Sequence, residues 1–370
     1  MKPIALARPD ITQREIEAVV EVLRTPNLSL GPKVQEFEQA FADYCATRYA
    51  VACNSGTSAL HLLMTAIGLR PGDEVIVTPF SFIASSNCVL FERATPVFAD
   101  IDPDTWNIDP RRVEEKLTAQ TKAIIPVDVF GHVADLDPIL ALARRRNISV
   151  IEDSCEALGA TYHGRRAGGL ADAGVFGFYP NKQITTGEGG MIVTDNRAWT
   201  DSCLSIRNQG RGAGGGWLAH ERLGYNFRLS DINCALGLAQ LRRVDEILAA
   251  RHRVAEMYLE RLGDDPRLIR QKALPGTTVS WFVFVLRLSD DYAPGHRDRI
   301  LTALREKGIG CSNYFAPIHL QPFYVERFGF RPGDLPVCEA LAARTIALPF
   351  YAHLSDAEID YACATLKALL

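Results

Sequence analysis

Residues 175–194 read Val175-Phe-Gly-Phe-Tyr-Pro-Asn-Lys182-Gln-Ile-Thr-Thr-Gly-Glu-Gly-Gly-Met-Ile-Val-Thr194, and this stretch decides how the rest of the chain is interpreted. Two apolar runs, 175–178 and 191–193, predict strands on either side of a turn-rich segment with three glycines. Lys182 is therefore expected to be held between strands, where burial disfavours the charged ammonium. A deprotonated amine can attack an aldehyde. The alternative is an ordinary solvated lysine in a loop.

The totals of the 370-residue chain restrict the class of protein. This length exceeds the size at which one core stops growing, so we expect a large α/β domain, residues 1–240, and a smaller C-terminal α+β domain, residues 241–370. The N-terminal helices could pack on the smaller domain. A net charge of −4 offers no basic surface for nucleic acid or an anionic membrane.

The cysteines and the N-terminus indicate the compartment. Nine cysteines without a C-x-x-C pair favour reduced thiols over a disulfide framework or a zinc site, so no metal is expected. The N-terminus lacks the apolar core of a signal peptide, and no run reaches membrane-spanning length. We expect a cytoplasmic protein.

Helices and strands are expected to alternate through the first part of the chain. The expected helices span 12–23, 32–47, 84–92, 110–117 and 137–146, and the expected strands span 49–53, 74–78, 97–100, 123–127 and 149–151. This alternation, with strands too apolar to face water, predicts a mainly parallel sheet with helices on both faces. Beyond the strand at 191–193, the pattern predicts a loop at 212–216, one long helix at 231–262, a strand at 279–288, a helix at 297–307 and a terminal helix from Asp356.

Two polar motifs follow predicted strands. Asn54-Ser-Gly-Thr57-Ser58 opens a helix, where backbone N–H groups and two hydroxyls could bind a phosphate; the alternative is simple N-capping. The motif lacks the lysine of a P-loop and the spacing of a dinucleotide fingerprint, which favours a smaller cofactor. Asp153 ends the apolar run 148–151, and a carboxylate there needs a cation or a protonated nitrogen unless it caps a helix. Together with Lys182, these features meet the needs of pyridoxal 5′-phosphate.

Over nearly its whole length the chain resembles the sugar aminotransferases of the DegT/DnrJ/EryC1/StrS family. The matching segments are Asn54-Ser-Gly-Thr-Ser-Ala-Leu60, Glu152-Asp-Ser-Cys-Glu-Ala-Leu-Gly-Ala160, 176–190, Gly224-Tyr-Asn-Phe-Arg-Leu-Ser-Asp231, Ala235-Leu-Gly-Leu-Ala-Gln240 and Pro317-Ile-His-Leu-Gln-Pro322. The resemblance implies the type I aspartate aminotransferase fold, with a mainly parallel sheet of the seven-stranded type between helices and a smaller C-terminal α+β domain.

The resemblance also implies roles for individual residues. Lys182 would bond to the cofactor and carry the proton between the cofactor C4′ and the substrate carbon, while Asp153 would keep the pyridine nitrogen protonated. The other implied cofactor contacts are Gly56, Thr57, Ser58, Phe82, Glu156, Gly177, Asn226 and Arg228. Of these, Asn226, with Arg228 as a second candidate, would reach the phosphate of the neighbouring subunit's cofactor, which implies a homodimer with shared sites. Tyr179 and His319 would lie near the sugar and its diphosphate, with local packing as the alternative.

Two residues depart from the family pattern. Gly177 stands where many members have a serine that donates to the phosphate, so only its backbone N–H remains. Glu156 stands where many members have glutamine near the cofactor's 3′-oxygen. Because a carboxylate beside a phenolate oxygen is repulsive, Glu156 is expected to be protonated, turned away or engaged with substrate.

The implied activity is transfer of an amino group from L-glutamate to a keto carbon of a nucleotide-linked deoxysugar, with a GDP- or dTDP-linked 4-keto-6-deoxyhexose as the first expectation. One alternative is another ketone, such as a cyclitol, or a dehydration reaction; dehydratase relatives have histidine in place of Lys182, which argues against the latter. A second alternative is a regulator that binds the cofactor without turnover.

Overall fold

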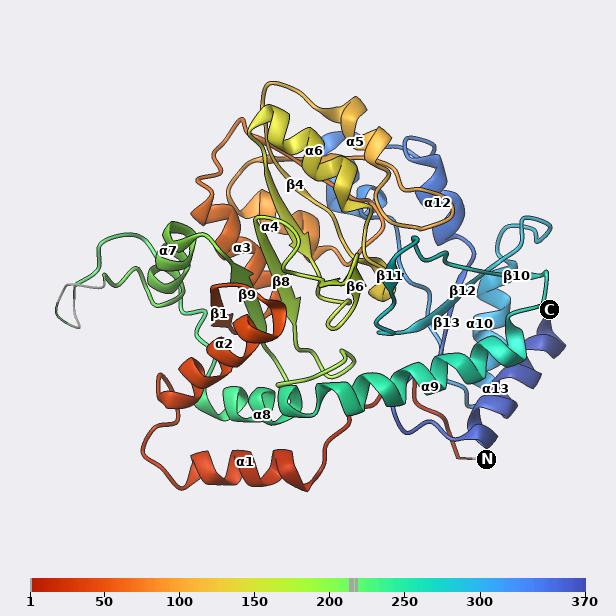
Figure 1. Ribbon diagram of the computed structural model, residues 1–370. Coiled ribbons are helices and arrows are strands. Elements are labelled where there is room, and N and C mark those ends of the chain that lie inside the picture. Colours follow the sequence, from red (N-terminus) through yellow and green to blue (C-terminus); the bar gives the residue numbers. More distant parts are fainter. Residues whose placement is uncertain (1, 213–215, 217–218) are drawn as a thin grey trace.

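The computed structural model describes residues 2–212, 216 and 219–370, and a seven-stranded sheet lies at its centre (Figure 1). The strand order is β1-β9-β8-β5-β4-β2-β3. The bounds are β1 Tyr49–Cys53, β2 Glu74–Val77, β3 Thr95–Phe98, β4 Thr121–Ile125, β5 Ser149–Asp153, β8 Ala173–Gly177 and β9 Gly190–Thr194. In this sheet β9 runs opposite to the other six strands, which all run in the same direction, so the predicted mainly parallel α/β fold is confirmed.

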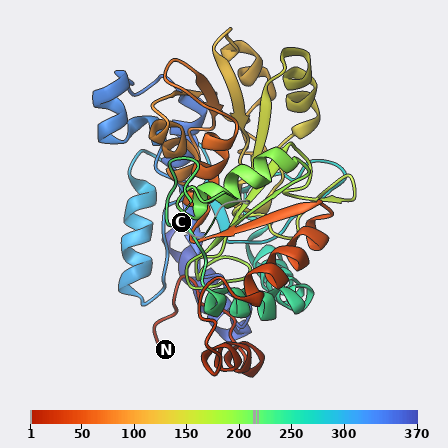
Figure 2. The same ribbon diagram turned by 90° about the vertical axis from the view of Figure 1, so that its left-hand side faces the viewer.

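Helices cover both faces of this sheet, as Figures 1 and 2 show. They are α2 Pro32–Cys45, α3 Gly56–Ala66, α4 Ala84–Phe91, α5 Pro110–Lys116, α6 Leu136–Arg146, α7 Arg197–Arg207 and α8 Asp231–Arg242. Alternate residues of β1 point to opposite sides, because side chains of a strand alternate between faces. Val51 and Cys53 join the core under α3, whereas Ala50 and Ala52 join the core under α2. Burial on both faces explains why these strands are almost wholly apolar.

The C-terminal part is built on a three-stranded antiparallel sheet of order β10-β12-β13. Its elements are α9 Val244–Leu262, β10 Leu268–Arg270, β12 Phe284–Leu288, α10 His296–Glu306, α11 Pro322–Phe328, α12 Pro336–Ala342, β13 Thr345–Leu348 and α13 Asp356–Leu369. A small third sheet joins β6 Thr161–Tyr162 and β7 Arg165–Arg166 to β11 Thr277–Thr278, and the 3-10 turns are η1 Val129–Gly131 and η2 Ile318–Leu320. In Figure 1 the long α9 leads from α8 to this part. The domain boundary at residues 240 and 241 stays a prediction.

The predicted helix 231–262 is wrong in one respect, because it is two helices that break at Arg243. The Arg243 guanidinium is buried and pairs with Asp10 at 2.8 Å and Glu15 at 2.6 Å. Glu15 lies on α1, Gln13–Leu23, where it completes the predicted capping box with Thr12. Although burial opposes it, hydrogen bonds from Thr12, Gln240 and Arg243 lower the pKa of Glu15 to about 2. The break therefore coincides with the ion pair that anchors α1, the outermost helix in Figures 1 and 2.

The predicted strand 279–288 also differs from the structure, because the ladder of β12 begins only at Phe284. The preceding backbone is bonded elsewhere: Ser280 N–H donates to the Gly131 carbonyl, and Arg251 donates to two carbonyls further along. Most of the predicted loop at 212–216 lies outside the described residues. None of the helices in the described part of the chain combines the length and the apolar character that a membrane span requires.

Candidate active site

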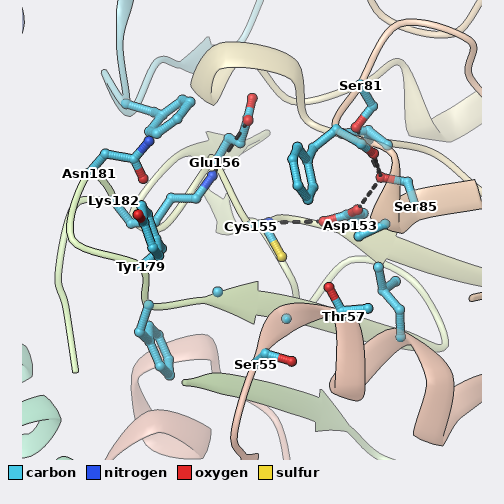
Figure 3. A pocket seen from close by; sticks show the side chains of 18 of the residues that line it. Ser55, Thr57, Ser81, Ser85, Asp153, Cys155, Glu156, Tyr179, Asn181 and Lys182 are labelled. Carbon is cyan, nitrogen blue, oxygen red and sulfur yellow. Dashed lines mark hydrogen bonds and ion pairs between the residues drawn. The ribbon is translucent and has the colours of Figure 1, made fainter. Parts of the chain in front are cut away.

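A cavity of about 530 Å³ opens at the carboxyl ends of the parallel strands, the edge where open α/β sheets bind ligands. Residues after β1, β2, β4, β5 and β8 line it, and the C-terminal part supplies one wall through Phe282, Tyr314 and Phe315. Figure 3 shows Lys182 and Glu156 pointing toward one another on one side of this cavity, with Thr57, Ser85 and Asp153 on the other. The fold thus brings three motifs that are far apart in sequence to one place.

The start of α3 forms the floor of the cavity. Ser55 caps the helix by accepting a hydrogen bond from the Ser58 N–H, and the first-turn N–H groups of a helix lack partners within the helix. A Cβ on Gly56 would come within 3.0 Å of the Cys155 sulfur and 3.4 Å of the Gly177 Cα. Glycine at 56 therefore lets the helix start approach the end of β8 closely. The result is a concave, backbone-lined seat that suits a phosphate group.

Thr57 lines this seat, whereas Ser58 does not. The Ser58 hydroxyl donates to the Asn54 side-chain carbonyl at 2.7 Å and accepts from the Ser55 hydroxyl at 2.9 Å. Both its hydrogen-bonding directions are thus used within the cap. Ser55 lines the cavity in its place, and the phosphate contact predicted for Ser58 stays a prediction that this geometry does not favour.

Asp153 ends β5 and is 4% exposed. One carboxylate oxygen accepts from the Ser85 hydroxyl at 2.7 Å, and the other accepts from the Cys155 N–H at 3.2 Å. Within the described ranges no lysine, arginine or histidine forms an ion pair with it. A buried carboxylate with only neutral donors around it is suited to bind a protonated nitrogen that enters the cavity.

Lys182 lies in the turn between β8 and β9, where its N–H donates to the Tyr179 carbonyl. The two strands predicted around it are confirmed. Its side chain is 15% exposed, and its Nζ lies 3.5 Å from a Glu156 oxygen and 3.9 Å from the centre of the Phe282 ring. The lysine is therefore held inside the cavity rather than solvated.

Glu156 is buried and faces Lys182 rather than turning away. Its other carboxylate oxygen accepts from the Phe130 N–H at 2.9 Å. Burial raises the pKa of this carboxyl, and the charge of Lys182 and the hydrogen bond from Phe130 offset only part of that increase. Glu156 is thus a group that retains a proton more readily than an exposed glutamate.

The remaining predicted site residues fall into two groups. Gly56, Gly177, Phe82 and Tyr179 line the cavity, and the last two are 62% and 55% exposed at its mouth. Asn226, Arg228 and His319 do not line it. Arg228 donates to the side chains of Asn208 and Gln209. His319 is fully buried, pairs with Glu339 and packs against Phe98 and Phe330, so the packing alternative fits its position better than contact with substrate.

Several residues that line the cavity were not predicted as site residues from the sequence. Ser55, Ser81, Ser85, Cys155, Asn181, Phe282, Tyr314 and Phe315 are the main ones. Asn181, next to Lys182, was the one that the sequence could have suggested; its side-chain carbonyl oxygen is buried without a hydrogen-bond partner in the described structure. Burial and the charge of Asp153 raise the pKa of the Cys155 thiol far above its ordinary value, so this cysteine is an uncharged wall of the cavity.

Two further carboxyl groups, Asp128 and Glu152, are fully buried, and Glu152 precedes Asp153 on β5. Asp128 accepts from the Ser154 hydroxyl at 2.8 Å and the Ala134 N–H at 2.9 Å, and Glu152 accepts from the N–H groups of residues 168 and 170. Burial and the charge of Glu152 raise the pKa of Asp128 well above 3.8. The folded protein thus keeps a proton that the unfolded chain loses, so the free energy of unfolding falls as the pH rises above that value.

We predict that Asp128→Asn removes this pH dependence, because the amide is neutral at every pH. Relative to the natural protein, the variant should gain stability as the pH rises, by at most about 1.4 kcal/mol per pH unit. Urea unfolding between about pH 5 and pH 8 measures this. As a control, Asp128→Ala leaves the Ser154 and Ala134 donors unpaired and should cost about 2–4 kcal/mol throughout. Parallel pH curves for the natural protein and Asp128→Asn would contradict the retention of a proton by Asp128.

The sequence profile of the DegT/DnrJ/EryC1/StrS aminotransferase family matches residues 9–367. A GDP-perosamine synthase of Caulobacter vibrioides is 42% identical, over 99% of this chain and 98% of the relative. The spore coat polysaccharide biosynthesis protein SpsC of Bacillus subtilis is 39% identical, over 95% of this chain and 93% of the relative.

Solved structures agree with the sequence matches. The sugar aminotransferase Spr1654 from Streptococcus pneumoniae, described as putative and solved in its PLP form, superposes with a TM-score of 0.93 at 30% identity, over 99% of this chain and 98% of that one.

Proposed function

Since the chain belongs to the DegT/DnrJ/EryC1/StrS aminotransferase family, we propose that it transfers the amino group of L-glutamate to the keto carbon of a nucleotide-linked 4-keto-6-deoxyhexose. The resemblance drawn from the sequence is confirmed, and with it aminotransferase activity on a sugar nucleotide and pyridoxal 5′-phosphate as the cofactor. The observation that carries the proposed amino transfer is the placement of Lys182, Asp153 and the start of α3 around one cavity.

The residues of the cavity fit this cofactor. The start of α3, with Gly56, Thr57 and the backbone of Gly177, would hold the phosphate, and Asp153 would hold the protonated ring nitrogen. The unpaired carboxylate of Asp153, buried with two neutral donors, is the observation that tests the fit. The exposed face of Phe82 at the mouth is available to stack on a ring.

When bound, the cofactor supplies an aldehyde that takes up the amino group and a ring that accepts electron density. Lys182 would bond to it covalently in the resting protein and would later move a proton to or from the substrate carbon through Nζ. Asp153 would keep a positive charge on the ring nitrogen. Glu156, whose pKa is raised by burial, would hold a proton beside Lys182 and so avoid repulsion with an anionic oxygen.

The proposal of a nucleotide-linked deoxysugar rests on the relatives. The 42% identical protein is a GDP-perosamine synthase, which favours a GDP-linked substrate over a dTDP-linked one. The alternative of another ketone, such as a cyclitol, fits the same cavity chemistry. A lysine at 182 argues against a dehydratase, because such relatives carry histidine there. The cytoplasmic location stays a prediction.

A panel of keto-sugar nucleotides with L-glutamate tests the function. Replacement of the visible cofactor band by that of the amine form on adding glutamate, followed by amination of a GDP-linked 4-keto-6-deoxyhexose, is the expected result. Cofactor binding with no spectral response to glutamate would favour a regulator. Turnover of a cyclitol ketone in preference to every sugar nucleotide would overturn the substrate proposal.

We further propose a homodimer in which each copy completes the partner's site. Asn226 and Arg228 lie outside the cavity lining of their own chain, so a contact with cofactor phosphate would have to occur in another copy. The planar guanidinium of Arg228 can donate charge-assisted hydrogen bonds to phosphate oxygens.

Mixed dimers of Lys182→Ala and Arg228→Ala are expected to regain activity. A heterodimer would carry both lesions in one site and none in the other, so random pairing should restore about a quarter of the sites. Activity of the unfractionated co-expressed protein measures this, and heterodimers purified through two different tags should have about half of their sites restored. The matched control combines Lys182→Ala with Asp153→Asn, which both lie in their own chain's cavity and should not complement. Activity equal to the mean of the two parents in both mixtures would show self-contained sites.

A further inference from the structure

Residues 280–282 form a junction between the C-terminal part and the segment that carries Lys182. The Gln183 side-chain amide donates to the Ser280 carbonyl at 3.1 Å and is within 3.0 Å of the Ser280 hydroxyl oxygen. Ser280 in turn donates through its N–H to the Gly131 carbonyl. Gln183, the residue next to Lys182, is thus hydrogen-bonded directly to this junction, which fixes the distance between Lys182 and residues 280–282.

Arg251 of α9 holds the same junction from the other side. Its buried guanidinium donates to the Trp281 carbonyl at 2.8 Å and the Phe282 carbonyl at 2.6 Å, and it lies over the Phe350 ring. Burial lowers the pKa of Arg251 to about 10, which leaves it charged at neutral pH. Charge-assisted hydrogen bonds to two successive carbonyls therefore fix the backbone of Phe282.

The Phe282 ring faces the nitrogen of Lys182. Phe282 is 4% exposed, and the Nζ lies 3.9 Å from the centre of its ring. The face of an aromatic ring carries partial negative charge and attracts an ammonium group within about 6 Å, more strongly where water is excluded. The Glu156 carboxyl lies 3.5 Å from the same nitrogen. Phe282 is thus an uncharged partner for a buried cation.

We propose that the face of Phe282 is the seat of the Lys182 ammonium whenever this nitrogen is not bonded to the cofactor, and that Phe282 thereby positions the nitrogen for its next proton transfer. The second half of this proposal rests on the proposed aminotransferase function, in which Lys182 must leave the cofactor and return in every turnover. Phe282 is a positioning residue, because its proposed role acts through Lys182.

The cofactor-free protein tests the contact between the Phe282 ring and the Lys182 ammonium without any measurement of enzyme activity. We expect acetylation of Lys182 by acetic anhydride, followed by peptide mass mapping, to be about 3- to 30-fold faster in Phe282→Leu, because the ammonium loses its aromatic partner. Phe282→Tyr keeps the ring face and should label at the natural rate. Trp281→Leu, which alters a neighbouring aromatic side chain without a contact to Lys182, is the matched control, and labelling of the exposed Lys272 gives the internal reference.

The loaded enzyme tests the positioning. With glutamate deuterated at its α-carbon, the isotope effect on kcat should rise in Phe282→Leu but not in Phe282→Tyr, because proton transfer becomes more rate-limiting when the nitrogen is misplaced. Phe282→Met serves as a second variant if Phe282→Leu does not fold. An unchanged labelling rate in Phe282→Leu would overturn the proposed contact between the Phe282 ring and the Lys182 ammonium. An unchanged isotope effect in this variant would overturn the positioning role. Absence of transamination in the natural protein would overturn the proposed function while leaving the labelling result valid.

Discussion

Lys182→Ala is expected to lose at least about 10⁴-fold in the rate of amino transfer, the largest effect that we predict for a single substitution. Alanine can neither bond to an aldehyde nor move a proton, and the nearest alternative group, Glu156, is a carboxyl with a raised pKa rather than an amine. The side chain is held between β8 and β9, with its nitrogen inside the cavity, so no exposed lysine can take its place.

Chemical trapping separates loss of the covalent bond from loss of folding. Borohydride reduction of the natural protein saturated with pyridoxal 5′-phosphate should place the adduct on the peptide that contains Lys182. The variant should show no adduct while its thermal unfolding stays cooperative. Lys272→Ala, which removes an exposed lysine paired with Asp104, is the matched control and should retain both the adduct and the activity. An adduct on a different lysine in the natural protein would contradict the assignment.

The parts of the fold that follow from local signals could be predicted closely. The bounds of β1 match the sequence prediction, and the capping box of Thr12 and Glu15 starts α1 where expected. Both signals lie within a few residues of the element that they define. The break at Arg243 has no such signal, because it coincides with ion pairs to Asp10 and Glu15, more than two hundred residues away in sequence.

The residues of the site likewise divide into those that local sequence signals predict and those that only tertiary packing places. Asp153 ends a strand, and Lys182 and the start of α3 each follow one. Because parallel strands bring their carboxyl ends to one edge, these groups could be predicted to meet. Ser85, which donates to Asp153, and Phe282, which faces Lys182, come from segments with no distinguishing pattern. The position of Ser85 depends on how α4 packs on the large sheet, and that of Phe282 depends on how the C-terminal part packs there. A single sequence contains no local mark of either packing.

Asp153→Asn is the second substitution for which we expect a large loss, about 10²- to 10⁴-fold in kcat. Breaking one partner of a buried ion pair has an effect of this size, and the amide cannot hold a positive charge on the ring nitrogen. The fold should be little changed, because the amide oxygen can still accept from the Cys155 N–H and the amide nitrogen can donate to the Ser85 hydroxyl. Stability should therefore fall by no more than about 1 kcal/mol. Ser85→Ala, which removes one donor and keeps the charge, should lose far less activity.

A cofactor analogue with carbon in place of the ring nitrogen tests the same interaction from the other side. If Asp153 acts through that nitrogen, the analogue should slow the natural protein about as much as the substitution does. Combining the two should then bring little further loss, because groups that act as one unit are not additive. Independent, multiplying losses would mean that Asp153 acts elsewhere, for example by orienting Ser85 or the first turn after β5. The role assigned to Asp153 thus predicts coupling between one carboxylate and one protonated nitrogen. The combination of Asp153→Asn with the cofactor analogue measures this coupling directly.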